Sequence, residues 1–538
     1  MSGGTAANVH RVGPRSDAVD VRLRLDRVEA GALVALAGLS LIVLAALLTK
    51  GRALTGADGL LASDQLQYFT WIRQASEHVL IGNEYDMTPD HRVFLHPGFL
   101  VSGALHAATG ISVPLSYLLW KPVAVGVAFA ATVLYTRRLL PAGGQRHAAL
   151  VLVLFAVMPA SWLVAWTHWG GKPRQYTFDF ISGEMATTQF MWGYLMTAIA
   201  VFLMPLVLLA LERWRADRRL RQLVAAAAGA LLVCWLQPWQ GGTLALIVLG
   251  VEALEWRRSA RRPQLAALAV PAAAALPAVY YAILARADAS WRLADASNAA
   301  GSQATWSWPW WAVVLTLLPL AAPAALAYRL PARGWQELAV RVWPFAALAI
   351  YLAPVGTFPY HSFQGLAIPL SILAVQGVAS RWPSPRPALV VACLVAMTAP
   401  GIGHKLSVAI NSIRAAGDPY FVFPGEARAM DALERDPRPG GVIAPAYAGH
   451  MLPYRTGREV YVGALSWTPH WAQRVRETQA LFEGPMGAAQ ARALVRRSRA
   501  RFAFVDCRPH LRDLTALLGP LVERVERYGC ATVYVLRP

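Results

Sequence analysis

An acidic residue and three aromatic rings share one short segment that could carry chemistry. The segment, residues 63–73 with the sequence SDQLQYFTWIR, comes soon after the first apolar stretch and predicts an amphipathic helix at a membrane surface. The rings of Tyr68, Phe69 and Trp71 would lie at the headgroup level. Asp64 would then face outward, where a carboxylate can act as a general base. The alternative is that Asp64, or Ser63 before it, only caps the helix.

A second candidate is the cation in the segment LLWKPVAV. Lys121 lies about two turns into the second apolar stretch, counted from its outer end. An unpaired ammonium at that depth is costly, so it is a functional candidate for binding an anionic group. The alternative is that its long side chain reaches back to the headgroups. Both interpretations stay open at this point.

Two short turns between apolar stretches carry polar side chains that could contact a substrate. The turn at residues 237–240 (QPWQ) could face a sugar, or it could be an ordinary turn with an interface tryptophan. In the turn at residues 359–364 (PYHSFQ), the histidine and the glutamine can donate hydrogen bonds to phosphate oxygens. The candidate contacts are Gln237, Trp239, Gln240, His361 and Gln364.

Two outer loops contain further charged residues. The loop at 168–188 could supply an acceptor contact or a second ionic contact, or its charges could simply be solvated. Its polar residues are His168, Lys172, Arg174, Asp179 and Glu184. In the first loop, Glu84, Asp86 and Asp90 could bind a divalent cation, although exposed acids usually bind nothing specific. We therefore expect no metal site and no cofactor. Phosphate loops, dinucleotide glycine patterns, zinc-spaced ligands and nucleophile elbows are also absent from the sequence.

The composition indicates that these residues belong to a polytopic membrane protein. Of the 538 residues, 56% are hydrophobic and only 15% are charged, against about 25% charged in a soluble domain. The net charge of +19 is typical of cytoplasmic loops that fix topology, and no basic stripe with interleaved aromatics suggests nucleic acid. The first apolar run, about 31–49, is too long for a signal-peptide core, so we expect a retained anchor.

Apolar stretches predict eleven membrane spans. After the first, they fall near 115–135, 148–166, 189–211, 222–237, 242–256, 264–284, 308–328, 343–359, 364–380 and 387–401. With the N-terminus in the cytoplasm, the inner segments hold 22 arginines and the outer loops 8 arginines and lysines. This asymmetry favours that orientation. Residues 93–110 are apolar, but if they crossed, every later loop would flip. We therefore expect an interfacial or re-entrant helix within a first outer loop at 50–114.

Three regions follow from this pattern. Residues 1–29 form a cytoplasmic segment, residues 30–401 a transmembrane helical bundle, and residues 402–538 a small extracytoplasmic α/β domain. In that domain we expect helices near 424–435 and 487–498. The expected strands are Val442–Ala446, Glu459–Gly463, Phe502–Asp506 and Ala531–Leu536.

The two cysteines of the predicted outer domain could form a disulfide bond. Cys507 ends a predicted strand, and a helix at about 510–520 would return the chain to the opposite edge of the sheet. If residues 521–527 form a strand parallel to the first, the following turn brings Cys530 back to the same edge. Without that strand, the sulfurs would be too far apart. We predict the bond, since an outer compartment permits oxidation.

The first outer loop resembles that of the GT-C glycosyltransferases. The resemblance rests on an N-terminal span, Asp-x-x-x-Tyr at Asp64 and Tyr68 on an interfacial helix, and His96-Pro97 before a second span. It implies a polytopic enzyme that takes sugars from polyprenyl-phosphate donors, with its acidic catalytic residue in this loop and an outer C-terminal domain. Gln65 stands where many relatives have a second acidic residue, which argues against a metal-assisted variant.

The resulting expectation is a multi-pass hexosyl- or pentosyltransferase of the cytoplasmic (inner) membrane. Asp64 would act as general base on an extracytoplasmic glycan, lipid or protein acceptor, and displacement would invert the anomeric carbon. Lys121 and His361 would stabilise the departing phosphate. Tyr68, His96, His168 and the turn residues would contact substrate. The alternatives are a transporter or lipid flippase, which would normally show internal repeats, and a non-catalytic scaffold of an envelope-synthesis complex.

Overall fold

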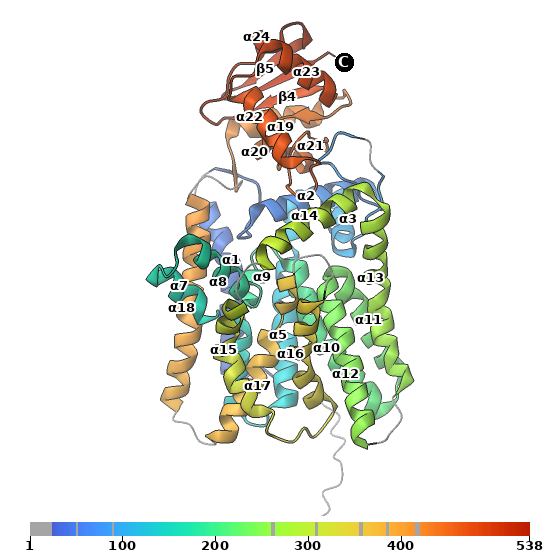
Figure 1. The fold of residues 1–538 in the computed structure, drawn as a ribbon, viewed down its shortest axis with the longest axis vertical. Helices are drawn as coiled ribbons and strands as arrows, with labels where there is room; N and C mark the ends of the chain where they lie inside the picture. The colour runs from blue at the N-terminus through green and yellow to red at the C-terminus, as the bar shows by residue number, and fades with distance from the viewer. Residues whose placement is uncertain are drawn as a thin grey trace, which may run out of the picture.

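The computed structural model describes residues 24–49, 52–88, 91–259, 264–306, 310–353, 359–382, 387–414 and 420–537. Most of the predicted cytoplasmic segment 1–29 and Asp90 therefore lie outside the described residues. The chain forms an elongated helical bundle with a smaller α/β unit at one end (Figure 1). Helix α1 (Arg27–Leu48) begins at a capping box, in which the Asp26 side chain accepts from the backbone of Val28 and Glu29.

Where the structure describes its residues, every predicted span corresponds to helix in the bundle, and parts of the spans 308–328 and 343–359 lie outside the described residues. The helices after α1 are α4 (Val113–Leu118), α5 (Trp120–Leu139), α6 (Gly143–Phe155), α7 (Pro159–Thr167), α10 (Leu195–Asp217), α11 (Leu220–Leu236), α12 (Pro238–Ser259), η1 (Leu265–Leu268), α13 (Ala269–Ala287), α15 (Trp310–Ala327), α16 (Trp335–Leu352), α17 (Ala367–Arg381) and α18 (Pro387–Arg414). Within the described residues, six helices are long and apolar enough to cross a membrane, or seven if the bent pair α6 and α7 is one span. The count of eleven spans stays a prediction.

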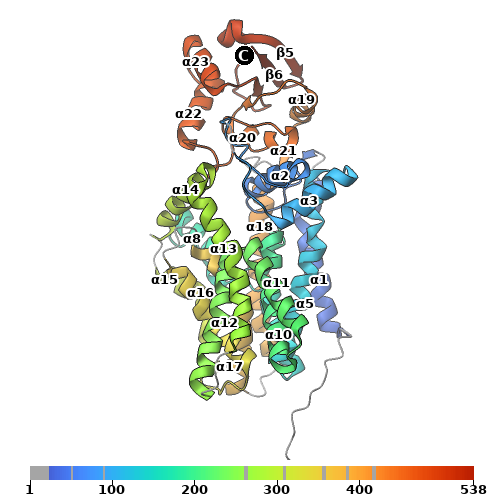
Figure 2. The same cartoon turned by 90° about the vertical axis from the view of Figure 1, so that its right-hand side faces the viewer.

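Helices α2 (Ala62–Glu77), α3 (Pro97–Thr109) and α14 (Ala289–Trp306) lie at the end of the bundle that faces the C-terminal unit (Figures 1 and 2). The remaining short helices are α8 (Gly171–Gly183), α9 (Thr187–Phe190) and η2 (Pro359–Phe363). Helix α3 lies within residues 93–110, the apolar segment that could be either a membrane span or an interfacial or re-entrant helix. It packs against α2 beside the C-terminal unit, as an interfacial helix would, and ends at Gly110, whose φ of +72° suits glycine.

The C-terminal unit is built on a four-stranded sheet in the order β3-β4-β6-β5. The strands are β3 (Val442–Ile443), β4 (Phe502–Val505), β5 (Val522–Tyr528) and β6 (Ala531–Leu536), and only β3 and β4 pair in parallel. Its helices are α19 (Pro424–Arg435), α20 (Ala446–Gly449), α21 (Leu452–Thr456), α22 (Trp471–Phe482), α23 (Ala488–Ser498), α24 (Thr515–Leu518) and η3 (Gly519–Leu521). The predicted α/β character is thus confirmed.

One predicted strand is wrong. Residues 459–463 form only a single parallel bridge, between Val460 and Val442. The bridge is made by the Val442 amide, which donates to the Glu459 carbonyl at 2.9 Å, and by the Tyr461 amide, which donates to the Val442 carbonyl at 3.1 Å. On its other side, the Val460 amide donates to the carbonyl of Glu84 in the first outer loop at 2.9 Å. This segment therefore joins the C-terminal unit to the loop.

The disulfide prediction is confirmed. Cys507 and Cys530 are bonded, and β5 provides the strand on which the prediction depended. Since β4 and β5 both run antiparallel to β6, they point the same way. The β5–β6 turn then lies at the edge where β4 ends. The helix expected at 510–520 is reduced to α24 and η3.

Backbone pairing links the C-terminal unit to the first outer loop. Strand β1 (Ala53–Leu54) pairs antiparallel with β2 (Phe421–Val422). The predicted domain boundary at 401 lies inside α18, which continues to Arg414. The loop that carries α2 is consequently held from both sides, by the bundle and by the C-terminal unit.

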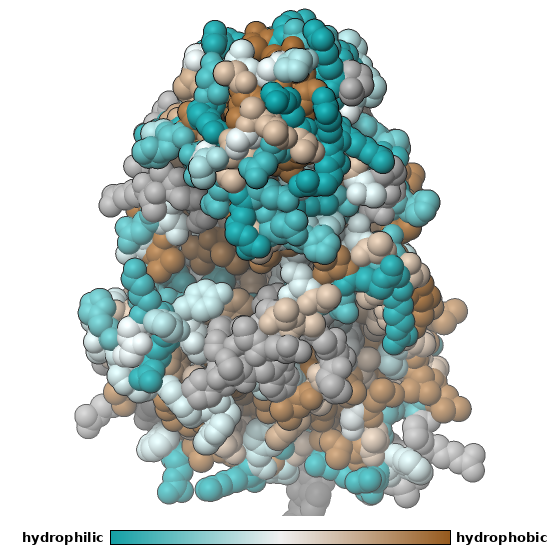
Figure 3. Space-filling view, turned by 45° about the horizontal axis from the view of Figure 1, so that its top comes forward, coloured by the Kyte–Doolittle hydropathy of each residue, from teal (hydrophilic) through white to brown (hydrophobic). Residues whose placement is uncertain are grey.

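The surface differs between the two parts. Figure 3 shows hydrophilic residues gathered over the C-terminal unit and hydrophobic residues along the flanks of the bundle. Such an apolar flank is expected where helices face lipid. The protein is a multi-pass membrane protein.

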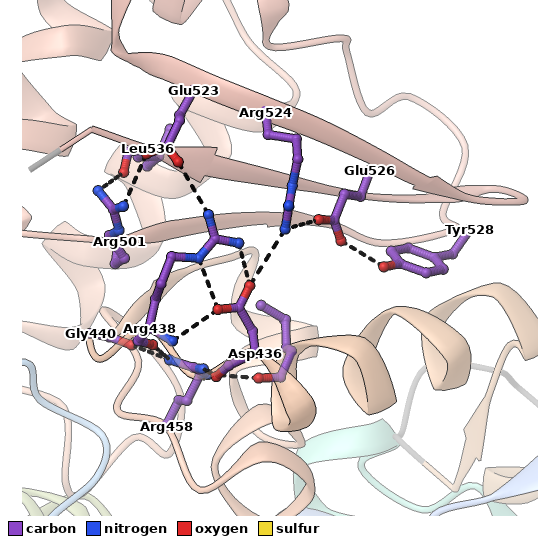
Figure 4. Close-up of polar contacts among 11 residues, drawn as sticks. Asp436, Arg438, Gly440, Arg458, Arg501, Glu523, Arg524, Glu526, Tyr528 and Leu536 are labelled. Atoms are coloured by element: carbon purple, nitrogen blue, oxygen red, sulfur yellow. Dashed lines mark hydrogen bonds and ion pairs between the residues drawn. The ribbon is translucent and has the colours of Figure 1, made fainter.

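On the C-terminal unit, an ion-pair cluster ties the end of α19 to β5 (Figure 4). Arg438 pairs with Asp436 and reaches Glu523 at 3.3 Å, and Arg501 pairs with the same Glu523 at 3.0 Å. Exposed pairs contribute only about 0–1 kcal/mol each. The cluster therefore orients the segment after α19 more than it drives folding.

Candidate active site

Asp64 lies in the first turn of α2 and does not cap the helix. The residue at the N-cap is Leu61, and no side chain caps the backbone amides of α2. A carboxylate in the first turn is still favoured by the helix dipole. The capping alternative is thus absent from the structure, which leaves the Asp64 carboxylate available for other contacts.

A tyrosine holds one oxygen of this carboxylate. The Tyr194 hydroxyl, just before α10, donates to Asp64 Oδ2 at 3.0 Å. The Asp64 side chain is partly exposed, but protein atoms replace most of the surrounding water. This burial raises the pKa of Asp64, against the lowering effects of the Tyr194 hydrogen bond and of His361. A raised carboxyl pKa suits a general base.

A second carboxylate, Glu184, stands at the centre of a hydrogen-bonded polar cluster. Its Oε2 lies 3.0 Å from His361 Nδ1 and accepts from Gln364 Nε2 at 2.7 Å. Gln364 Oε1 in turn accepts from Gln237 Nε2 at 2.8 Å. The charges of Glu184 and His361 both act on Asp64. The structure therefore brings the two predicted turns together, within electrostatic range of Asp64.

His361 is held by the first turn as well as by Glu184. The Gln240 amide donates to the His361 carbonyl at 2.8 Å, and the ring of Trp239 lies edge-on to the imidazole, with centroids 4.9 Å apart. Burial favours the neutral imidazole, but the charge and hydrogen bond of Glu184 outweigh it and raise the pKa of His361. The site therefore favours an imidazolium close to Asp64.

Tyr68 follows Asp64 by one turn of α2 and belongs to an aromatic layer. Its ring lies 5.4 Å from Phe99 and 6.0 Å from Tyr117, measured between centroids. The His96 ring stacks on the Phe99 ring, with centroids 3.9 Å apart, and its Nδ1 caps α3 by accepting from the Phe99 amide. His96 therefore packs against the aromatic layer. Burial lowers the pKa of His96 to about 3. His96 is accordingly neutral and packed within this layer, and its contact with substrate stays a prediction.

Two other predicted contacts lie apart from the cluster. His168 ends α7 with φ of 54° and is exposed. Lys121 is not the unpaired ammonium that its depth suggested, because its Nζ lies 2.5 Å from Asp58 Oδ2. It also donates to the carbonyls of Ser40 and Met191. Its role at a donor phosphate stays a prediction, now alongside a structural role in this buried ion pair.

Glu184 and Tyr194 are the residues for which sequence reasoning was insufficient. Glu184 was one of several loop charges without a distinguishing pattern. For Tyr194 the sequence offers only one signal, a polar aromatic residue directly before an apolar helix. Each contacts a residue more than 100 positions away in the chain, so local spacing could not reveal either contact.

The acids of the first loop are engaged elsewhere. Asp86 pairs with Arg474 of α22 at 2.8 Å. Burial, with the charge of Glu459, raises the pKa of Glu84 to about 8, which makes it a poor cation ligand near neutral pH. In the part of the chain that the structure describes, no group of three or more His, Cys, Asp or Glu side chains could hold a metal ion. The absence of a cofactor stays a prediction.

Comparisons with known proteins give structural neighbours only. No protein-family profile matches the sequence, and no curated protein matches it. Among solved structures, the chain resembles the oligosaccharyltransferase AglB from Archaeoglobus fulgidus, in complex with an inhibitory peptide and a dolichol-phosphate. The TM-score is 0.46 at 12% identity, over 89% of this chain and 69% of that one.

A second neighbour is ArnT from Cupriavidus metallidurans bound to undecaprenyl phosphate. Here the TM-score is 0.48 at 14% identity, over 94% of this chain and 97% of that one. The proposed chemistry rests on this chain's own residues.

Proposed function

We propose that the protein is a GT-C glycosyltransferase that moves a sugar from a polyprenyl phosphate to an acceptor outside the cytoplasm. The observation that carries the proposal is a partly exposed carboxylate, Asp64, beside a histidine whose pKa is raised, at one end of an apolar helical bundle. A lipid-linked donor would reach such a site from the bilayer, and the acceptor from the aqueous side.

The proposed reaction is a single displacement. Asp64 takes the proton of the acceptor hydroxyl while the hydroxyl oxygen attacks the anomeric carbon of the donor sugar. The bond from that carbon to the phosphate oxygen breaks, and the phosphate leaves with the electron pair and the polyprenyl chain. Attack from the opposite face inverts the anomeric carbon. Phosphate is a good leaving group, so the imidazolium of His361 needs only to stabilise the developing negative charge.

The test is Asp64→Asn in the purified full-length protein. We expect normal expression and donor binding, with turnover lowered at least about a hundredfold, because a positioned base contributes about 10²–10⁴-fold in rate. In a strain that lacks the gene, wild-type protein should lower the pool of lipid-linked sugars measured by mass spectrometry, and Asp64→Asn should not.

The matched control is Asp86→Asn, an ion-paired acid of the same loop that lies outside the cluster. It should keep most of the turnover. Normal turnover in Asp64→Asn would exclude the proposed mechanism. Lipid movement without sugar transfer by the wild-type protein would instead indicate a transporter or flippase.

A further inference from the structure

Tyr194 is a polar side chain at the candidate active site that the proposed reaction does not yet use. It stands directly before α10, more than 100 residues from α2 in the chain. A phenol that touches a catalytic carboxylate can either fill space or control the orientation of that carboxylate. The backbone around Tyr194 and the geometry of its hydroxyl distinguish these roles.

Three contacts fix the segment that carries Tyr194. The Trp192 indole donates to the carbonyl of Leu39 in α1 at 2.7 Å, and the Tyr117 hydroxyl donates to the carbonyl of Gly193 at 2.7 Å. Gly193 has φ of +92°, and a Cβ atom there would lie 2.7 Å from the Cα of Gly59. The backbone before Tyr194 thus touches the loop that leads into α2. Tyr194 and Asp64 therefore share one rigid frame.

The hydroxyl contacts only one oxygen of the carboxylate. Tyr194 donates to Oδ2 of Asp64 at 3.0 Å. Oδ1 accepts no hydrogen bond from the residues that the structure describes, and the Asp64 side chain is partly exposed. The terminal torsion of an aspartate is broad, so without a partner either oxygen could face the aqueous side. The hydrogen bond therefore occupies Oδ2 and leaves Oδ1 as the oxygen that can accept a proton from an acceptor.

We propose that Tyr194 is a positioning residue, which holds Oδ2 of Asp64 and leaves Oδ1 turned toward the acceptor hydroxyl. This role rests on the proposed function of Asp64 as the base. It adds a residue that decides which oxygen takes the proton and fixes the direction from which the acceptor approaches.

The electrostatics agree with a permanent donor. Burial and the charge of Asp64 raise the pKa of Tyr194 well above its usual value, so the phenol stays protonated. Its hydrogen bond lowers the pKa of Asp64, whereas burial raises it. The other titratable groups that act electrostatically together with Asp64 are Tyr68 of α2, Tyr176 and Glu184 of the second loop, and His361 of η2.

The experiment titrates the Asp64 carboxyl directly. Infrared difference spectra of the purified full-length protein, taken against Asp64→Asn, isolate its protonated carboxyl band as the pH is varied. In Tyr194→Phe the carboxylate loses a charge-assisted hydrogen bond. We expect the midpoint of the band to move to higher pH by about one unit. An unchanged midpoint would overturn the proposal.

Tyr117→Phe is the matched control, because it removes a buried hydroxyl that bonds the same segment through its backbone. Its midpoint should stay at the wild-type value. An equal shift in both variants would show that packing, not the hydrogen bond, acts on Asp64. Should Tyr194→Phe fail to fold, 3-fluorotyrosine placed at position 194 keeps the shape but donates more strongly, and it should move the midpoint to lower pH.

Turnover separates this proposal from the proposed function. Tyr194→Phe should lose roughly tenfold in kcat at an unchanged donor KM, since misorientation affects the transition state more than donor binding. Normal turnover in Asp64→Asn would overturn the base role and with it the function. Loss of turnover in Asp64→Asn, with a wild-type midpoint and kcat in Tyr194→Phe, would overturn the positioning role alone.

Discussion

Asp58 and Asp64 are close in sequence but have opposite surroundings. Asp58 is fully buried, pairs with Lys121 at 2.5 Å and accepts from Gln65 at 3.0 Å. Asp64 is partly exposed and has a single hydroxyl donor, Tyr194. Both oxygens of Asp58 are therefore engaged by protein side chains, whereas Asp64 keeps one oxygen without a hydrogen bond from the residues that the structure describes. This contrast favours Asp64 as the base.

Lys121→Met tests the ion pair at the residue scale. The variant leaves a buried carboxylate at Asp58 without its cation, so we expect the free energy of unfolding to fall by about 3–5 kcal/mol. The double variant Asp58→Asn with Lys121→Met should recover much of that loss. Chemical unfolding in detergent measures both. A raised donor KM with unchanged stability would instead place Lys121 at the donor phosphate.

Glu184→Gln tests the charge of His361. Since the folded-state pKa of His361 is raised, the pair stabilises the protein fully below the ordinary histidine pKa of about 6.5. This stabilisation is lost as the pH rises through the raised value. As the pH rises from about 6.5 through the raised pKa of His361, we expect the Tm of the wild-type protein to fall relative to the Tm of Glu184→Gln. A constant Tm difference from pH 5 to pH 9 would contradict the pairing.

At the scale of elements, the disulfide bond fastens the end of β4 to the β5–β6 turn beside α19. Both sulfurs lie within 3.4 Å of the place where a Cβ on Gly425, at the start of α19, would stand. The bond closes a loop with a sequence separation of 23. It therefore restricts the unfolded chain as well as the folded sheet.

Replacing Cys507 and Cys530 by serine should lower the free energy of unfolding of the C-terminal unit by about 3 kcal/mol. A reductant should have the same effect on the wild-type protein and none on the double variant. Cys393→Ser is the control, because that thiol is free and exposed. Two free thiols in this unit, counted under denaturing and non-reducing conditions, would contradict the bond.

At the scale of the whole molecule, α2 lies between the bundle and the C-terminal unit. Its Arg73 pairs with Glu434 of α19 at 2.7 Å, and its Phe69 ring packs on Tyr454 of α21 at 5.6 Å between centroids. The helix that carries Asp64 is therefore positioned by both parts. The C-terminal unit must therefore lie on the same side of the membrane as the first outer loop.

Reporter fusions test the proposed orientation. Fusions after Arg138 and Arg219 should give cytoplasmic signals, and a fusion after Pro538 an extracytoplasmic one, because arginine-rich loops stay in the cytoplasm. A cytoplasmic signal after Pro538 would contradict both the N-terminus inside and the outer position of the C-terminal unit.

From the sequence, one can predict a membrane protein, the positions of its apolar helices and an α/β unit with a disulfide bond. The sequence also singles out Asp64 and the turns around His361 and Gln237 as candidate site residues. These features depend on composition and on local periodicity, which act over a few residues. Only the tertiary structure shows that Lys121 is paired, that His96 packs on Phe99, that residues 459–463 contribute a single bridge to the sheet, and that Glu184 and Tyr194 join the candidate site. Each of these depends on a partner from a distant part of the chain, and a partner of that kind leaves no local pattern in the sequence.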